Sequence, residues 1–220
     1  MLGEKIILGF LVLHIAGGTV SLLSGLVSIL TLKGGKTHRA AGKIYFWGMT
    51  AVFVGALVLA IMKGNDFLLM VGFFSYYLTV RGYRILSLKQ LGKQKPLLLD
   101  WFITVVSGLF IVSLIGWGIY VLVRAHSGMG IVAIAFGGIG LTSLIADLKN
   151  FIRGPKEKMH WWFTHLGSMS GSYIAATTAF LVVNIHLPQF NWTLWLLPTV
   201  IGSVLIAQST RKYKIQFGVK

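Results

Sequence analysis

Three histidines and two aspartates stand at the ends of long apolar segments, where their side chains could bind a metal ion. They are His38, Asp100, Asp147, His160 and His165. Imidazole and carboxylate groups are ligands of Zn²⁺, iron and Mn²⁺, and a carboxylate often orients a ligating imidazole. His160 and His165 are five residues apart, about 140° around a helix, so they do not form a one-face pair. The residue types predict a metal or haem site, with interfacial histidines and salt-bridged acids as the alternative.

His14 is different because it lies inside the first apolar segment. Its helical face continues through Gly17, Ser21 and Gly25, which turns the imidazole toward other helices and away from lipid. We expect a buried neutral histidine that is bonded to a hydroxyl group. A haem or metal ligand is the second interpretation of the same residue.

Two arginines and several tyrosines follow at the inner end of the third apolar segment. Arg81 and Arg84 stand close to Tyr76, Tyr77 and Tyr83. We interpret them as arginines that extend toward the headgroups and as interfacial tyrosines. The functional alternative is a contact with an anionic headgroup or a substrate phosphate.

The composition explains why these polar residues stand out. Of 220 residues, 55% are hydrophobic and 11% charged, with a mean hydropathy of +0.79. A soluble domain carries about 25% charged residues. The chain is therefore an integral membrane protein. It has no cysteine, which excludes disulfides, thiolate metal sites and cysteine nucleophiles.

The apolar segments and the basic residues together predict a topology. Lys and Arg number seventeen in one alternating set of loops and three in the other. Because short basic loops stay in the cytoplasm, this places the N-terminus outside and the C-terminus in the cytoplasm. The net charge of +15 then reflects topology and anionic lipid headgroups, and no nucleic acid partner is expected. The fold predicted is all-α, a single domain over 1–220 with seven transmembrane helices, near 5–32, 41–62, 67–88, 97–123, 130–148, 161–184 and 192–209.

Small residues at four-residue spacing indicate where these helices pack. The first segment has Gly17, Ser21 and Gly25, and the fifth has three glycines between 137 and 140. The sixth has one stripe through Gly167, Gly171 and Ala175 and a second through Ser168 and Ser172. In lipid such residues let helix backbones approach each other, so we expect these faces to be buried against other helices. A homo-oligomer is also compatible with this pattern.

The segment 38–45, HRAAGKIY, resembles a family of bacterial predicted multi-pass membrane proteins of unknown function. Those proteins carry His-Arg-x-x-Gly-x-x-Tyr between their first two spans, and a later histidine followed by small residues and Ser-Tyr. Here 159–162, MHWW, and 171–176, GSYIAA, look like the second element, although Trp161 and Trp162 replace a basic pair. The resemblance implies a location in the bacterial cytoplasmic (inner) membrane and no established activity. It marks His38, Arg39, Gly42, Tyr45 and His160.

The side chains of this segment also predict contacts. Arg39 could hold a phosphate, a haem propionate or a carboxylate such as Asp100. Tyr45 follows nearly one turn after Gly42, and we expect His38 to face His160 across the cytoplasmic mouth of the bundle.

Four functions therefore remain open at this point, and the sequence does not decide whether the protein is an enzyme. The first is binding of haem b or a divalent metal through histidines near the cytoplasmic face. The second is a transporter or a small-molecule-binding helix bundle without catalytic activity. The third is a metal-dependent intramembrane hydrolase. A purely structural role needs no site at all.

Overall fold

The computed structural model describes residues 2–185 and 191–219, which form seven α-helices and one short 3₁₀ turn. This confirms the predicted all-α class. The elements are α1 Leu2–Leu30, α2 Lys36–Lys63, α3 Asp66–Arg84, η1 Ile85–Ser87, α4 Leu98–Ala125, α5 Met129–Arg153, α6 His160–Asn184 and α7 Asn191–Phe217.

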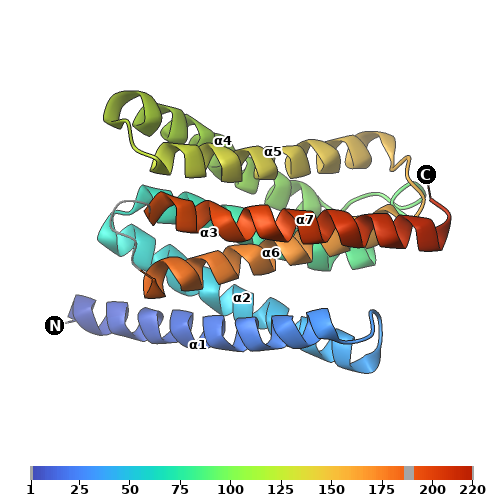
Figure 1. The fold of residues 1–220 in the computed structure, drawn as a ribbon, viewed down its shortest axis with the longest axis horizontal. Helices are drawn as coiled ribbons and strands as arrows, with labels where there is room; N and C mark the ends of the chain where they lie inside the picture. Colours follow the sequence, from blue (N-terminus) through green and yellow to red (C-terminus); the bar gives the residue numbers. More distant parts are fainter. Residues whose placement is uncertain (1, 186–190, 220) are drawn as a thin grey trace.

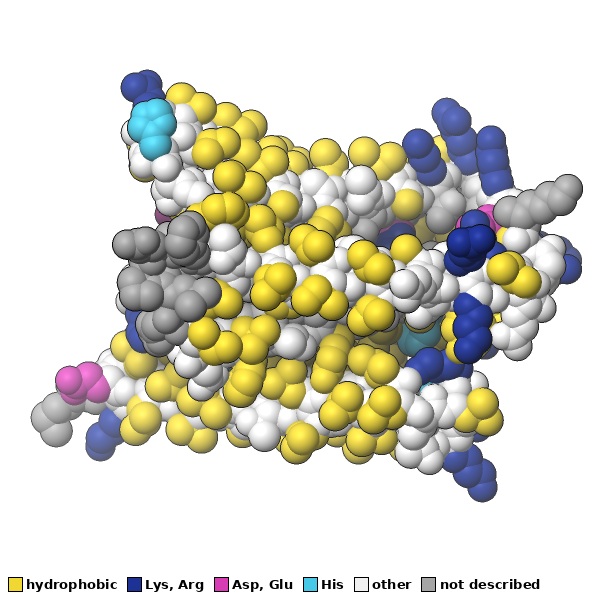
Figure 2. All heavy atoms as spheres, in the orientation of Figure 1, with side chains coloured by type: hydrophobic (Ala, Val, Ile, Leu, Met, Phe, Trp, Pro, Cys, Tyr) yellow, Lys and Arg dark blue, Asp and Glu magenta, His cyan; other side chains and the backbone are white. Residues whose placement is uncertain are grey.

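The helices lie side by side in one bundle, with the N-terminus at one end and the C-terminus at the other (Figure 1). Large apolar side chains cover the flank, while most Lys and Arg side chains gather at the end that holds the C-terminus (Figure 2). Leu23, Phe102 and Leu109 are each more than 60% exposed. Six helices of the described chain, all except α3, are long and apolar enough to cross a membrane. The protein is an integral, multi-pass membrane protein.

Helix α3 has 19 residues and a central position. It packs against α2, α4, α5 and α6, so most of its surface meets protein. Its core residues include Phe74, Tyr77 and Leu78, each about 3% exposed or less. Because α3 touches so little lipid, it can carry polar and charged side chains without exposing them to hydrocarbon.

Helices α1 and α2 pack through the small residues that the sequence indicated. The three buried residues of α1 are Gly17, Ser21 and Gly25. A Cβ atom on Gly17 would lie 2.9 Å from the carbonyl oxygen of Gly48, so the two backbones are in contact. The predicted stripe on the first span is therefore confirmed as a packing face.

The glycines of α5 have two different surroundings. A Cβ atom on Gly137 or Gly140 would meet isoleucine side chains of α4 at 2.4 to 2.9 Å. Gly138 points the other way, and a Cβ there would meet nothing within 4 Å. Two of the three glycines thus let α4 and α5 approach each other, as predicted, and the third does not.

A tight turn joins α2 to α3 at the end opposite the C-terminus. Gly64 ends α2 with φ 61°, a left-handed conformation that glycine adopts without strain. The Asn65 side chain then accepts a hydrogen bond from the backbone N–H of Leu68 at 2.9 Å and caps α3. The turn therefore reverses the chain with local hydrogen bonds only.

Candidate functional site

Each arginine at the C-terminal end of α3 pairs with an aspartate from another helix. Arg81 Nε lies 2.8 and 2.9 Å from the two carboxylate oxygens of Asp147 in α5. Arg84 donates to Asp100 in α4, from Nε at 2.7 Å and from Nη2 at 3.3 Å. The two ion pairs tie α3 to the helix pair α4–α5 at two points.

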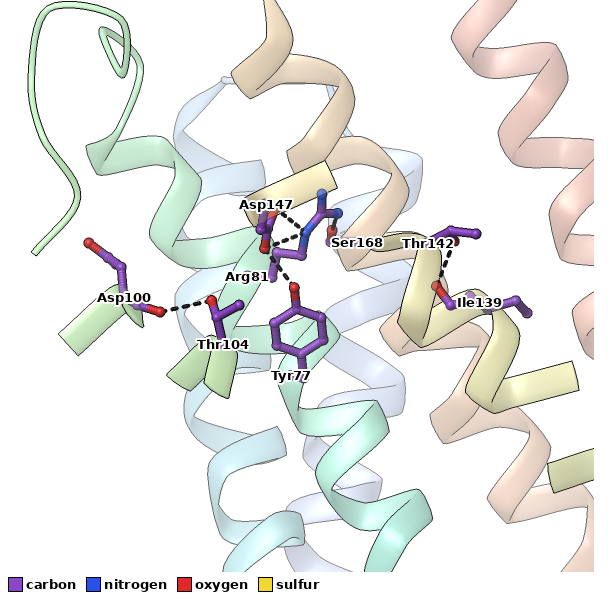
Figure 3. Close-up of polar contacts among 8 residues, drawn as sticks. All are labelled: Tyr77, Arg81, Asp100, Thr104, Ile139, Thr142, Asp147 and Ser168. Carbon is purple, nitrogen blue, oxygen red and sulfur yellow. Dashed lines mark hydrogen bonds and ion pairs between the residues drawn. The ribbon is translucent and has the colours of Figure 1, made fainter. Parts of the chain in front are cut away.

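The Arg81–Asp147 pair is buried and includes two further side chains (Figure 3). Tyr77 donates its hydroxyl proton to Asp147 Oδ2 at 2.6 Å, and Arg81 Nη1 donates to Ser168 Oγ at 2.6 Å. The side chains of Arg81 and Asp147 are only 11% and 9% exposed. A buried charge is tolerated when it is paired and hydrogen-bonded, and both conditions hold here. The network joins α3, α5 and α6.

Asp100 also stabilises the start of its own helix. Its Oδ2 accepts the backbone N–H of Leu97 at 2.7 Å, which is one of the donors that a helix N-terminus leaves without an intrahelical partner. A negative charge in the first turn also interacts favourably with the helix dipole. Asp100 therefore has structural partners on both sides, and its exposed fraction is 3%.

Our interpretation of Arg81 and Arg84 as arginines extended toward the headgroups is wrong. Their guanidinium groups turn into the protein, and Arg84 occupies the position at Asp100 that we had considered for Arg39. Arg39 itself is exposed. The spacing of Tyr77, Arg81 and Arg84 could have predicted this, because residues four and three apart lie on one helical face. One polar face on a helix in the membrane indicates contact with other helices.

His38 of α2 and His165 of α6 form a pair whose ring centroids lie 6.2 Å apart. His38 Nδ1 is 2.9 Å from the carbonyl oxygen of Ser28, and His165 Nδ1 is 2.7 Å from that of Gly82. A carbonyl only accepts, so both Nδ1 atoms carry the proton in the neutral ring and both Nε2 atoms keep a lone pair. Metal-ligating histidines are typically oriented in this way.

The surroundings of this pair are positively charged. Lys33 and Lys89 lie near enough to His165 to act on it electrostatically. Lys33 Nζ donates to the carbonyl oxygen of Ser28 at 3.1 Å, and partial burial lowers the pKa of this ammonium group. Lys89 Nζ lies 4.5 Å from the ring centroid of Trp161. Two nearby cations repel a third, so the pair is a poor place for a divalent metal ion.

The remaining predicted histidines lie elsewhere. We expected His160 to face His38, but the ring beside His38 is that of His165. The imidazole of His160 is 8% exposed, and its Nε2 atom has no hydrogen-bond partner in the described part of the chain. His14 Nδ1 is 2.9 Å from the carbonyl oxygen of Val52, so its partner is a backbone carbonyl and not the hydroxyl that we expected.

No group of three or more His, Asp or Glu side chains within 2–185 and 191–219 is arranged to hold a metal ion. The predicted ligands fall into separate places. Both carboxylates are paired with arginines, and the ring of His38 lies beside that of His165. His160 takes part in neither the ion pairs nor the histidine pair. A metal or haem at these residues stays a prediction.

Tyr45, the other residue marked for cofactor binding, is buried where α2, α3 and α6 meet. Its hydroxyl lies 2.8 Å from Ser172 Oγ, which in turn lies 2.6 Å from Thr79 Oγ1. The exposed fraction of Tyr45 is 2%. These three hydroxyls satisfy one another inside the bundle, and binding of a cofactor by Tyr45 likewise stays a prediction.

A cavity of about 230 Å³ lies between α3, α5, α6 and α7. Most of its wall is apolar, and its polar lining consists of Arg81, Ser143, Ser168, Thr199 and Ser203. It reaches the flank of the bundle, since Ile139 and Ser203 on its wall are exposed. A second cavity, of about 30 Å³, lies between the two ion pairs and has room for water.

The sequence did not indicate the larger cavity. We took the stripe through Gly167, Gly171 and Ala175 for a packing face, but these residues line the cavity. At Gly167 the interpretation is wrong, since a Cβ there would meet nothing within 4 Å. The parallel stripe of Ser168 and Ser172 is buried, as expected.

Comparisons of the chain with protein-family models, with curated proteins and with solved structures find no match. The motifs at 38–45 and 159–176 therefore identify no family, and the chemistry of the site follows from its own residues.

Proposed function

We propose that this protein is a membrane-embedded binding bundle, which holds a small, largely apolar molecule in the cavity between α3, α5, α6 and α7. One observation supports this most strongly. The hydroxyls of Ser143, Thr199 and Ser203 line a mostly apolar wall and make no hydrogen bond to any other residue in the described chain.

Unpaired hydroxyls in an apolar setting are unfavourable. A hydroxyl that is fully buried without a partner costs about 1–3 kcal/mol. Ser143 and Thr199 are half-buried and Ser203 is exposed on the flank, where the hydrocarbon core offers no bulk water as a partner. A bound molecule with polar atoms would restore these hydrogen bonds. Ligand pockets usually combine a largely apolar wall with a few polar groups, and this cavity has that composition.

The size of the cavity sets the size of the ligand. A dry apolar cavity of about 150 Å³ already binds benzene, so about 230 Å³ holds a somewhat larger molecule or the end of an aliphatic chain. Because the cavity reaches the exposed flank at Ser203, we infer that the ligand enters laterally from the bilayer.

Binding is better supported than the metal-dependent alternatives. A hydrolase of the kind considered needs a carboxylate that is free to act as a base. Asp100 and Asp147 are both held by arginines, and the paired histidines have lysines as neighbours. The cavity needs neither a metal nor a free acid.

Filling the cavity is expected to abolish binding. Gly167→Leu adds a side chain where a Cβ has open space, and it projects into the cavity. With a short-chain aliphatic ketone that carries a photoreactive diazirine, we expect labelling of α6 and α7 in the wild type. Labelling of the variant should be at least about tenfold weaker than that of the wild type, which corresponds to a loss of about 1.4 kcal/mol in binding free energy.

The matched control is Gly138→Leu. Gly138 also has open space around its Cβ but does not line the cavity, so labelling should stay at the wild-type level. Equal labelling of the wild type and Gly167→Leu would rule out the cavity as the binding site.

We further propose that α3 is a seventh span and that the basic end faces the cytoplasm. At about 1.5 Å per residue, 19 residues extend about 28 Å, close to the thickness of the hydrocarbon core. Pairing of Arg81 and Arg84 with aspartates lowers the charge penalty that would otherwise oppose insertion. The excess of Lys and Arg at one end supports the orientation.

Two single cysteines in this cysteine-free chain test the topology. Both Lys63 and Lys93 are exposed, one at each end of the bundle. In intact cells, a membrane-impermeant maleimide should label Lys63→Cys at once and Lys93→Cys only after the membrane is opened. The reverse pattern, or labelling of both from outside, contradicts the proposed topology.

A further inference from the structure

We infer that the molecule in this cavity carries no net charge and presents a hydrogen-bond acceptor, such as a carbonyl or ether oxygen, to Arg81. The inference rests on the proposed function and adds the chemical class of the ligand. It follows from the charges and the hydrogen-bond donors on the cavity wall.

Arg81 is the one charged side chain among the described residues that line the cavity. Its positive charge is already balanced, because its Nε lies within 2.9 Å of both oxygens of Asp147. A carboxylate, phosphate or sulfonate in the cavity would bring a second anion to one cation. An uncompensated buried charge is strongly unfavourable, so the balanced pair selects against anions.

A cationic ligand is disfavoured for the same reason. The cavity wall has no carboxylate, so an ammonium group there would be a poorly solvated charge without a counter-charge of its own. Only an uncharged ligand leaves the Arg81–Asp147 pair electrically balanced.

The same guanidinium defines the polar group of the ligand. Arginine has five N–H donors and no acceptor. In the described chain, Arg81 uses Nε for Asp147 and one N–H of Nη1 for Ser168, and Tyr77 is a further side-chain partner of the guanidinium, so not all five N–H groups are taken. The matching group on a ligand must therefore be an acceptor. The unpaired hydroxyls of Ser143 and Thr199 can add further hydrogen bonds.

Two photoreactive probes with the same short chain test this directly. One ends in a methyl ketone and the other in a sulfonate, which stays ionised at any usable pH. In the wild-type protein in lipid nanodiscs, we expect the ketone to label the cavity-lining peptides at least about tenfold more than the sulfonate, a preference of about 1.4 kcal/mol.

The variant Asp147→Asn should reverse this preference. It keeps the shape of the side chain and removes the charge that balances Arg81, so the sulfonate should now label at least as strongly as the ketone. Glu157→Gln is the control, since Glu157 pairs with Lys214 near the surface, and it should leave the preference unchanged.

The outcomes separate this inference from the proposed function. Stronger labelling by the sulfonate in the wild type would overturn the inference that the ligand is uncharged, while the cavity would remain the binding site. No labelling by either probe, or labelling that survives Gly167→Leu, overturns both. The wild-type comparison stands by itself if Asp147→Asn does not fold.

One further arm identifies the source of a neutral ligand. The ketone probe can also be attached as one acyl chain of a zwitterionic phospholipid. Labelling of the cavity-lining peptides by this lipid assigns the site to the chain of a membrane lipid that enters from the flank. Labelling by the free ketone alone assigns it to a free small molecule.

Discussion

Replacing Asp147 with alanine is expected to lower the free energy of unfolding by about 3–5 kcal/mol. The substitution leaves the guanidinium of Arg81 buried without its counter-charge, and it also removes the acceptor of the Tyr77 hydroxyl. Because these groups join α3, α5 and α6, the loss affects the centre of the bundle. The loss should be visible as a shift in the equilibrium unfolding of the protein in mixed micelles with increasing denaturing detergent.

Two controls test whether this loss of stability comes from an unpaired charge in a buried position. Glu157→Ala breaks the pair with Lys214, whose side chains are 35% and 39% exposed, and should change the stability by less than about 1 kcal/mol. The double variant Arg81→Met with Asp147→Leu removes both charges and should be more stable than Asp147→Ala. If Asp147→Ala and Glu157→Ala had equal effects, the buried pair would not hold the bundle together.

Gly17→Leu is expected to destabilise the contact between α1 and α2 by about 3 kcal/mol, the upper end of the usual range for overpacking. The added Cβ would lie 2.9 Å from the carbonyl oxygen of Gly48 and 3.0 Å from the Cβ of Ala51. The nearest obstacle is a backbone atom, so the strain cannot be relieved by rotation of a side chain. Separation of the two helices is the expected response.

The neighbouring glycine supplies the comparison. A Cβ on Gly18 would meet only Val52 Cγ2, at 3.9 Å, so Gly18→Leu should be nearly neutral. Detergent-induced unfolding of both variants measures the difference. Similar midpoints for Gly17→Leu and Gly18→Leu would contradict the close approach of the two backbones.

The sequence predicted the class of the fold well because the signal is local. Long apolar segments and small residues at four-residue spacing follow from the needs of a helix in lipid. The buried set of α1, Gly17, Ser21 and Gly25, could be named in advance for this reason. Helix α3 was harder, since a helix surrounded by protein is free to include charged residues and its apolar pattern is weaker.

The site was predicted less well because it depends on which helices are neighbours. Nothing in the sequence says that Asp147 meets Arg81 or that Asp100 meets Arg84. We therefore considered both acids for a metal site, with salt-bridged acids as the alternative, and the structure shows the salt bridges. We also placed His38 opposite His160 because the sequence does not show which helices are neighbours. The histidine that lies beside His38 is His165, five residues further along α6. The knowledge that buried acids must be paired points to an arginine, but not to which one.

The cavity could not be read from the sequence at all. Gly167 belongs to a stripe of small residues with the same spacing as the stripe in α1. A Cβ on Gly167 would meet nothing within 4 Å, whereas a Cβ on Gly17 would meet the backbone of α2. A stripe of small residues shows only that this face of the helix has no large side chains and leaves space beside it. What occupies the space depends on the neighbouring helices and on how closely they approach.

An experimental structure of the protein in lipid nanodiscs, at a resolution that shows bound molecules, tests the central claim most directly. We predict density for an elongated or ring-shaped molecule between α3, α5, α6 and α7, with its polar end within hydrogen-bonding distance of Arg81. A cavity closed by the side chains of α5 and α7, with Ser143, Thr199 and Ser203 bonded to other protein groups, would contradict it.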